Sequence, residues 1–187
     1  MKVTLVMPQS ARPALAPKRD AQDLKPPVGL LALGAACRAD HDVSIVDAQA
    51  CRRPPARIAE MVAHAQPDVV GISVPFSSLW GSARTIAGGI RQRFGNEVPL
   101  VFGGVVPTFR PEQVLRECAA DIVQRHESDL TFPQLLRSLE SGEWRDTPGV
   151  SFLENDSLIE RPFDHFVDNL DDLPFPAYDL LDDENRY

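Results

Sequence analysis

The sequence predicts an α/β fold in which a doubly wound, flavodoxin-like sheet of five parallel strands carries helices on both faces. Short apolar runs alternate with longer segments of helical periodicity as far as residue 139. The apolar runs lack polar alternation, which is typical of parallel strands buried on both faces. Small or turn-forming residues follow each run, as expected where parallel strands end at one edge of a sheet.

The expected elements follow from this alternation. The five strands are expected at residues 2–7, 41–47, 68–73, 99–102 and 121–123. The five helices are expected at residues 28–39, 55–65, 79–94, 112–118 and 130–139. The first helix follows Pro26-Pro27, and the third ends at Gly95, which fits the usual helix start and stop signals. Right-handed crossovers then favour the strand order 2-1-3-4-5.

The end of the chain follows a different pattern. Apolar runs at 150–153 and 158–161 flank Asn155-Asp156, which predicts a β-hairpin. After Pro162 the periodicity disappears, and acidic residues and prolines predict an extended acidic strap. We therefore expect three parts: a Rossmann-like domain at 1–148, a hairpin extension at 149–162, and a linker or strap at 163–187. A further long loop, 8–27, is expected to be a lid or binding loop.

Composition excludes several classes of protein. The formal net charge is −8 and the pI is about 4.9, which argues against a basic surface for nucleic acid. No apolar run is long enough to span a membrane. Cys37, Cys51 and Cys118 are scattered and do not have metal-ligand spacing. Without a signal-peptide pattern, they indicate reduced thiols in a cytoplasmic protein.

The carboxyl edge of the sheet is the expected binding site, because the loops after parallel strands meet there. Those loops carry Ser73 and Ser77 after the third strand and Gly103, Gly104 and Thr108 after the fourth. Such a lining is small, polar and almost uncharged, which suits a large neutral ligand lying against backbone. A tight turn at the glycines and helix capping by the serines are the alternatives.

Three common ligands of this architecture are disfavoured. The loop after the first strand, Pro8-Gln9-Ser10, lacks the glycines that a dinucleotide site requires. It also lacks the acidic pair that holds a divalent cation in a phospho-acceptor receiver domain. Its single hydroxyl is too little for the phosphate of a flavin.

Six blocks of the sequence resemble the cobalamin-binding, N-terminal domain of cobalamin-dependent radical SAM proteins. The blocks cover most of the chain in order and are Lys25-Pro26-Pro27-Val28-Gly29-Leu30-Leu31-Ala32-Leu33, Val43-Ser44-Ile45-Val46-Asp47-Ala48, Pro67-Asp68-Val69-Val70-Gly71-Ile72-Ser73-Val74, Val101-Phe102-Gly103-Gly104-Val105-Val106-Pro107-Thr108-Phe109, Asp121 to Phe132, and Asp171 to Leu181. The last block is similar to the linker that leads from that domain to the radical SAM barrel.

The resemblance implies a cobalamin with its nucleotide tail in the crevice at the sheet edge. Its contact positions are matched here by Ser73, Val74, Gly103, Gly104, Thr108 and Glu127, and we add Ser77 for its hydroxyl. No D-x-H-x-x-G run follows the first strand, so we expect no protein histidine on cobalt. His41 and His64 are expected at the surface.

The resemblance also implies a function: the cobalamin-binding domain of a radical SAM methyltransferase. No C-x-x-x-C-x-x-C run is present to hold a 4Fe-4S cluster. The cluster and SAM are therefore expected only with a radical SAM barrel in cis or trans, and no catalytic residue or resident metal site is expected here. Where the family motif has two glycines, this chain has His126 and Ser128. The alternative is a free-standing interaction module in which these side chains fill the pocket and the acidic strap docks a partner.

Overall fold

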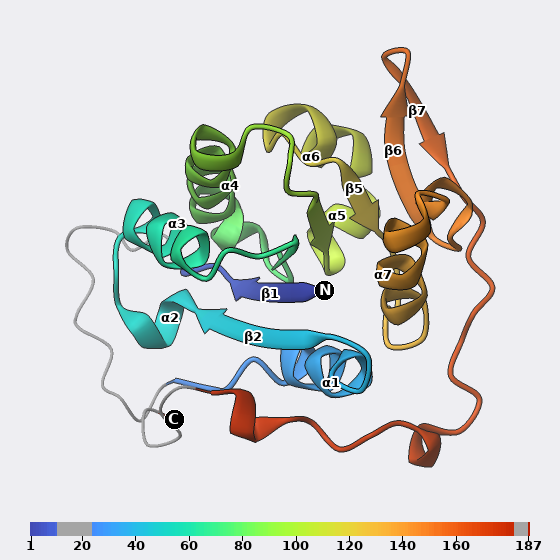
Figure 1. The fold of residues 1–187 in the computed structure, drawn as a ribbon, viewed down its shortest axis with the longest axis horizontal. Helices are drawn as coiled ribbons and strands as arrows, with labels where there is room; N and C mark the ends of the chain where they lie inside the picture. The colour runs from blue at the N-terminus through green and yellow to red at the C-terminus, as the bar shows by residue number, and fades with distance from the viewer. Residues whose placement is uncertain (11–23, 182–186) are drawn as a thin grey trace.

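A computed structural model describes residues 1–10, 24–181 and 187, and within them the chain forms one seven-stranded sheet (Figure 1). The strand order is β2-β1-β3-β4-β5-β6-β7. The first five strands pair in parallel, and β6 and β7 continue the sheet as an antiparallel hairpin. The strands are β1 Lys2–Met7, β2 Asp42–Asp47, β3 Val69–Ser73, β4 Leu100–Gly103, β5 Ile122–Gln124, β6 Val150–Glu154 and β7 Ser157–Glu160.

The predicted parallel sheet and its strand order are confirmed. The hairpin also forms where it was expected, but it extends the same sheet, because β6 pairs with β5 through Ser151 opposite Val123. Residues 11–23, the middle of the loop that was predicted to be a lid or binding loop, lie outside the described part of the chain.

Two of the helices were not predicted from the sequence. The helices are α1 Val28–Cys37, α2 Ala48–Cys51, α3 Pro55–His64, α4 Trp80–Phe94, α5 Val105–Phe109, α6 Pro111–Glu117 and α7 Thr131–Ser141. The unpredicted ones, α2 and α5, have only four and five residues, too few for a helical period to show. The N–H of Gln49 donates to the Asp47 side chain at 2.8 Å, which caps α2.

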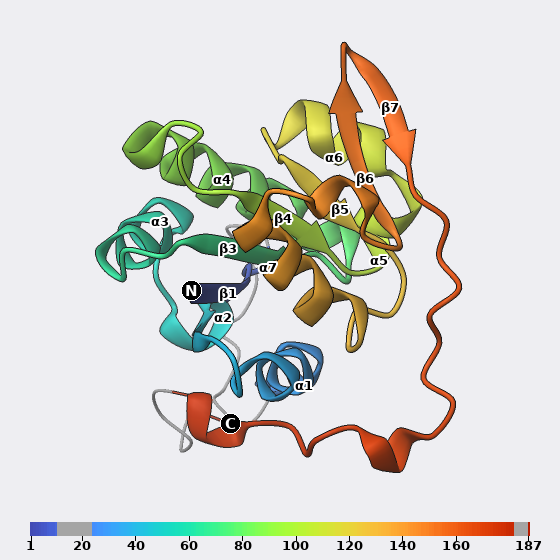
Figure 2. The ribbon, with the colours of Figure 1, turned by 45° about the vertical axis from the view of Figure 1, so that its right-hand side comes forward.

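Helices cover the two faces of the sheet unequally. Helices α3, α4 and α6 pack along one face, while α1 and α7 lie on the other (Figures 1 and 2). This follows from the right-handed crossovers: the chain moves outward from β1 to β2 and then back through β3 to β5. The face with only two long helices is the one on which the candidate site lies.

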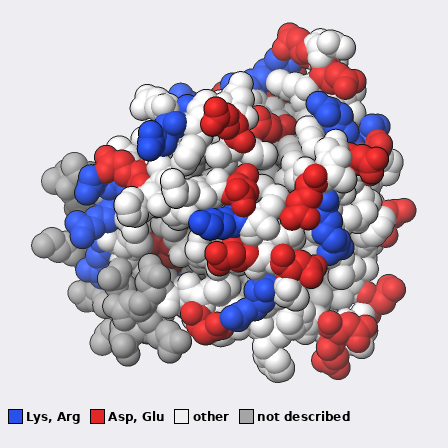
Figure 3. Space-filling model, viewed as in Figure 1, with Lys and Arg blue, Asp and Glu red and all other residues white. Residues whose placement is uncertain are grey.

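The strap, residues 163–181, runs from the hairpin along the outside of α1 (Figures 1 and 2). The N–H of Ala177 donates to the Leu31 carbonyl of α1 at 3.1 Å. The Arg38 guanidinium donates to both carboxylate oxygens of Asp179, at 2.8 and 2.7 Å. Acidic side chains gather at the lower right of the molecule, where the strap turns through Leu170–Asp172 (Figure 3). The strap is thus docked on the domain although it has no long element of its own.

Burial changes the chemistry of several titratable groups. His41 was expected at the surface, but that prediction is wrong: it is 7% exposed where β2 begins. Burial is also the main reason that its pKa lies below the ordinary value. Burial raises the pKa of the Cys37 and Cys118 thiols to about 12, so both behave as small apolar side chains. None of the described helices is long and apolar enough to cross a bilayer.

Two neighbouring glycines of α4 provide a test of the packing between α3 and α4. A Cβ at Gly89 would lie only 2.5 Å from the Ala59 Cβ of α3, whereas one at Gly88 meets nothing within 4 Å. We predict that Gly89→Ala lowers the free energy of unfolding by about 1–2 kcal/mol, because overpacking outweighs the gain in helix propensity. Gly88→Ala should raise it by up to about 1 kcal/mol. Urea denaturation measures both, and equal effects of the two variants would contradict the tight helix contact.

Candidate functional site

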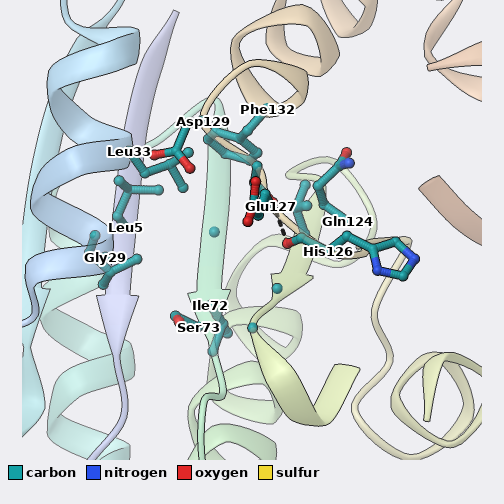
Figure 4. A pocket seen from close by; sticks show the side chains of 16 residues that line it. Leu5, Gly29, Leu33, Ile72, Ser73, Gln124, His126, Glu127, Asp129 and Phe132 are labelled. Carbon is teal, nitrogen blue, oxygen red and sulfur yellow. Dashed lines mark hydrogen bonds between the residues drawn. The ribbon is translucent and has the colours of Figure 1, made fainter. Parts of the chain in front are cut away.

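A slot of about 230 Å³ opens between α1 and α7 over the middle of the sheet (Figure 4). It reaches the carboxyl ends of β3, β4 and β5, where Ser73, Gly103 and Glu127 belong to its lining. This is the edge at which open α/β sheets bind ligands. The predicted location of the site is therefore an actual cavity in this structure.

Small residues of two neighbouring strands, Gly71 and Ser73 of β3 and Gly103 of β4, lie on the floor of the slot. Gly71 pairs with Val101, and Ser73 pairs with Gly103, so all four residues face the same side of the sheet. A Cβ at Gly71 would come within 2.8 Å of the Leu5 Cδ2 atom. Larger side chains in this row would fill the slot.

Apolar side chains form the walls of the slot. Leu30 and Leu33 of α1 lie on one side and Phe132 of α7 on the other, with Leu5 of β1 between them. Gly29, in the first turn of α1, also borders the slot, and a Cβ placed there meets no atom within 4 Å. The cavity thus has the apolar, partly preformed character of a site for a flat ring.

The turn after β4 depends on a glycine. Gly104 adopts φ 97° and ψ −176°, a conformation that residues with a Cβ essentially never adopt. Gly104 also lies close to Val74: a Cβ added at Gly104 would be 3.0 Å from the carbonyl carbon of Val74. The Val74 N–H donates to the Gly103 carbonyl at 2.8 Å, and the Val106 N–H donates to the Val74 carbonyl at 3.1 Å. Buried Val74 therefore joins the turns after β3 and β4 through its backbone.

The slot loop, residues 125–129, follows β5 and contains His126 and Ser128, the two side chains that fill the pocket in the alternative hypothesis. The His126 ring points away from the slot (Figure 4). It stacks on Phe163 of the strap, with 4.8 Å between ring centroids. The Ser128 hydroxyl donates back to the His126 carbonyl at 3.4 Å. The His126 ring therefore leaves the slot open.

Two carboxylates flank the slot. Glu127 and Asp129 both belong to its lining, and Asp129 reaches across to Leu33 of α1 (Figure 4). In the described part of the chain, no lysine or arginine forms an ion pair with either. The described walls are therefore unlike a phosphate site and suit a neutral ring with amide or hydroxyl donors.

The seven residues selected from the sequence are placed in three ways. Ser73, Gly103, Gly104 and Glu127 line the slot. Val74 and Thr108 hold its loops, since the Thr108 hydroxyl accepts the N–H of His126 at 3.0 Å. Ser77 begins an exposed 3₁₀ turn, Ser77–Leu79, and does not belong to the lining.

Exposed apolar side chains stand on the segments that follow the parallel strands, and we call them the apolar rim. The apolar rim consists of Val28 at the start of α1, Phe76 after β3, Val105 and Phe109 at the two ends of α5, and Leu130 before α7. Phe76 and Phe109 are 68% and 79% exposed. The side chains of the apolar rim do not line the slot, but they stand on the segments that follow the parallel strands, and exposed apolar surface at such an edge is typical of a binding site.

The slot walls were missed as site residues. Gly29, Gly71 and Phe132 stand in blocks that carry the family resemblance, so their signal was present in the sequence. Leu5 lies outside those blocks and has the same apolar pattern as core residues, so nothing in the sequence separates it from the core. Among the described residues, no group of three His, Cys, Asp or Glu side chains could hold a metal ion.

Comparison with known proteins places these features in a family. Residues 20–136 match the family model described as the B12 binding domain. An uncharacterised methyltransferase of Pyrococcus horikoshii is 37% identical over 183 residues, which are 97% of this chain and 39% of that protein. The anaerobic magnesium-protoporphyrin IX monomethyl ester cyclase of Synechocystis sp. is 28% identical over 91% of this chain and 34% of that protein. The chain therefore spans well under half the length of these relatives.

Solved structures with the same fold include two cobalamin enzymes. The radical S-adenosylmethionine methyltransferase TsrM from Kitasatospora setae, with cobalamin and a [4Fe-4S] cluster bound, gives a TM-score of 0.69 at 18% identity. That match covers 94% of this chain and 31% of TsrM. The cobalamin-dependent S-adenosylmethionine radical enzyme OxsB, with aqua-cobalamin bound, gives a TM-score of 0.75 at 20% identity. That match covers 96% of this chain and 24% of OxsB. At these identities the likeness establishes the fold.

Adjacent glycines in the turn after β4 test the close approach of the loops. We predict that Gly104→Ala lowers the free energy of unfolding by about 1–3 kcal/mol, because its backbone conformation and its contact with Val74 both exclude a Cβ. Gly103→Ala is the matched control: its Cβ would lie 3.6 Å from the Gln124 carbonyl oxygen, an ordinary contact. Chemical denaturation of the two variants provides the measurement, and a Gly104→Ala protein as stable as the control would refute the strained turn.

Proposed function

Because this chain belongs to the B12-binding domain family, we propose that it holds a cobalamin with its nucleotide tail in the slot. The glycine-floored slot between α1 and α7 is the observation that carries the proposal. Its apolar walls and its hydroxyl at Ser73 match a planar benzimidazole and the sugar attached to it. Its volume of about 230 Å³ suits this tail, while the corrin ring requires the surface outside.

The corrin ring would lie on the apolar rim at the carboxyl edge. A corrin is a broad and largely apolar disc whose margin carries amides. Phe76 and Phe109 offer exposed apolar area, and Glu127 offers an acceptor for amide N–H groups. When bound, a cobalamin supplies a cobalt centre that carries a methyl group. The residues of this chain bind and orient it.

We further propose that no histidine of this chain ligates cobalt. All four histidines lie in the described part of the chain. His41 is buried at the amino end of β2, and His64 ends α3. The His165 ring pairs with Asp164 at 2.6 Å, and the His126 ring stacks on Phe163 outside the slot. The positions of these rings support a cobalamin held through its tail and periphery.

The domain would serve a larger catalytic assembly. The chain spans 39% and 34% of two relatives, and solved structures of the same fold are radical SAM enzymes. We propose that residues 1–148 form the cofactor domain, residues 149–162 extend its sheet, and residues 163–187 link it to a radical SAM barrel in cis or trans. Methyl transfer, the iron–sulfur cluster and SAM belong to that assembly.

The visible absorption spectrum of the protein after mixing with a cobalamin tests the function directly. We predict that purified protein mixed with hydroxocobalamin retains the visible corrin absorption after desalting. A protein that elutes colourless would contradict cobalamin binding and favour the alternative, an interaction module that uses the acidic strap.

A second experiment tests the slot itself. We predict that Gly29→Phe weakens hydroxocobalamin binding at least tenfold, because Gly29 lines the slot and a Cβ there meets no atom within 4 Å, which leaves room for a larger side chain at the slot. Gly88→Phe is the matched control, since Gly88 is also a helical glycine with open space around its Cβ but lies on α4. Titration by absorbance gives both affinities. Equal affinities in the two variants would place the ligand elsewhere.

A further inference from the structure

The slot loop and the start of the strap form one connected unit. The Arg125 N–H donates to the Gly149 carbonyl at 3.0 Å, and the Gly149 N–H donates to the Pro162 carbonyl at 2.9 Å. Arg125 also pairs with Glu160 of β7 at 3.4 Å. The loop that borders the slot is thus tied to the point where the strap leaves the sheet.

His126 is the residue at which this unit is strained. Its φ of 63° lies in the left-handed region, which costs a residue with a Cβ about 1 kcal/mol or more. Three contacts hold this conformation: the N–H donates to the Thr108 hydroxyl at 3.0 Å, the carbonyl accepts from the Ser128 hydroxyl at 3.4 Å, and the ring stacks on Phe163. Of these three contacts, the stacking is the one made to the strap.

Phe163 is itself held in place by the strap and the hairpin. Its ring meets Phe166 edge-on, with 5.1 Å between centroids. It also packs over Gly149, where an added Cβ would lie 2.9 Å from the Phe163 Cδ2 atom. The stacking partner of His126 is therefore fixed only while the start of the strap stays where it is.

We propose that the strap gates the slot through His126. With Phe163 against it, the imidazole is held outside and the slot stays open. When the start of the strap moves away, the ring gains the other staggered rotamers about its Cα–Cβ bond, and the loop loses the contact that offsets its strained backbone. The loop then closes on the slot. His126 is in this sense a positioning residue.

This inference rests on the proposed function and adds a regulation to it. Coupling between two sites is reciprocal, so a ligand in the slot also holds the strap on the domain. A partner that binds or pulls the strap would accordingly change how tightly the cobalamin is held. The strap is also the segment proposed to lead toward the radical SAM barrel, so the position of that barrel would be transmitted to the cofactor site.

A double-mutant cycle tests the gate. Phe163→Ala should weaken hydroxocobalamin binding about fivefold or more, the usual lower range for coupled sites. His126→Gly removes the ring and the backbone strain, so adding Phe163→Ala to it should change the affinity little. Phe175→Ala is the control, because Phe175 also belongs to the strap but is 94% exposed and has no stacking contact with His126. Equal weakening by Phe163→Ala in both backgrounds, or none in either, overturns the gate.

Amide hydrogen exchange tests the same contact without ligand. In the free protein, Phe163→Ala should speed exchange at residues 126–129, and Phe175→Ala should not. Unchanged exchange at these residues in Phe163→Ala overturns the inference. A wild-type protein that binds no cobalamin would instead refute the proposed function, while the exchange result would still decide whether Phe163 holds the loop.

Discussion

The structure depends on a row of small residues on one face of the parallel sheet, beside which a slot remains open. In most sheets of this kind, side chains on both faces are covered by helices. Here Gly71, Ser73 and Gly103 lie on the face that carries α1 and α7, and a slot of about 230 Å³ remains between these helices. The empty volume is therefore a product of the sequence, and the apolar walls make it a site for a flat ring.

The loops around this slot show how backbone interactions carry a site with few functional side chains. Val74 joins the turns after β3 and β4, and Thr108 joins the turns after β4 and β5. The strap then extends this network to the outside of α1 through Ala177 and Asp179. Exposed ion pairs such as Arg38–Asp179 contribute little each, so the position of the strap rests on many weak contacts. Such a segment responds readily to a partner.

Much of the fold could be predicted from the sequence, because long apolar and helical periods determine it. The five parallel strands and their order are confirmed, whereas α2 and α5 were missed because one-turn helices have no detectable period. The site could be predicted in part: its glycines and Ser73 stand out at strand ends, but Leu5 does not differ from core residues. The His126 ring lies against Phe163, a contact between distant segments that local sequence does not encode.

The central claim is that the slot holds the nucleotide tail. Cobinamide has the same corrin ring but lacks that tail, so its affinity relative to hydroxocobalamin measures the contribution of the slot alone. If the slot holds the tail, cobinamide binds at least tenfold more weakly than hydroxocobalamin, and Gly29→Phe removes this difference. Equal affinity for the two corrinoids in the wild-type protein would contradict it.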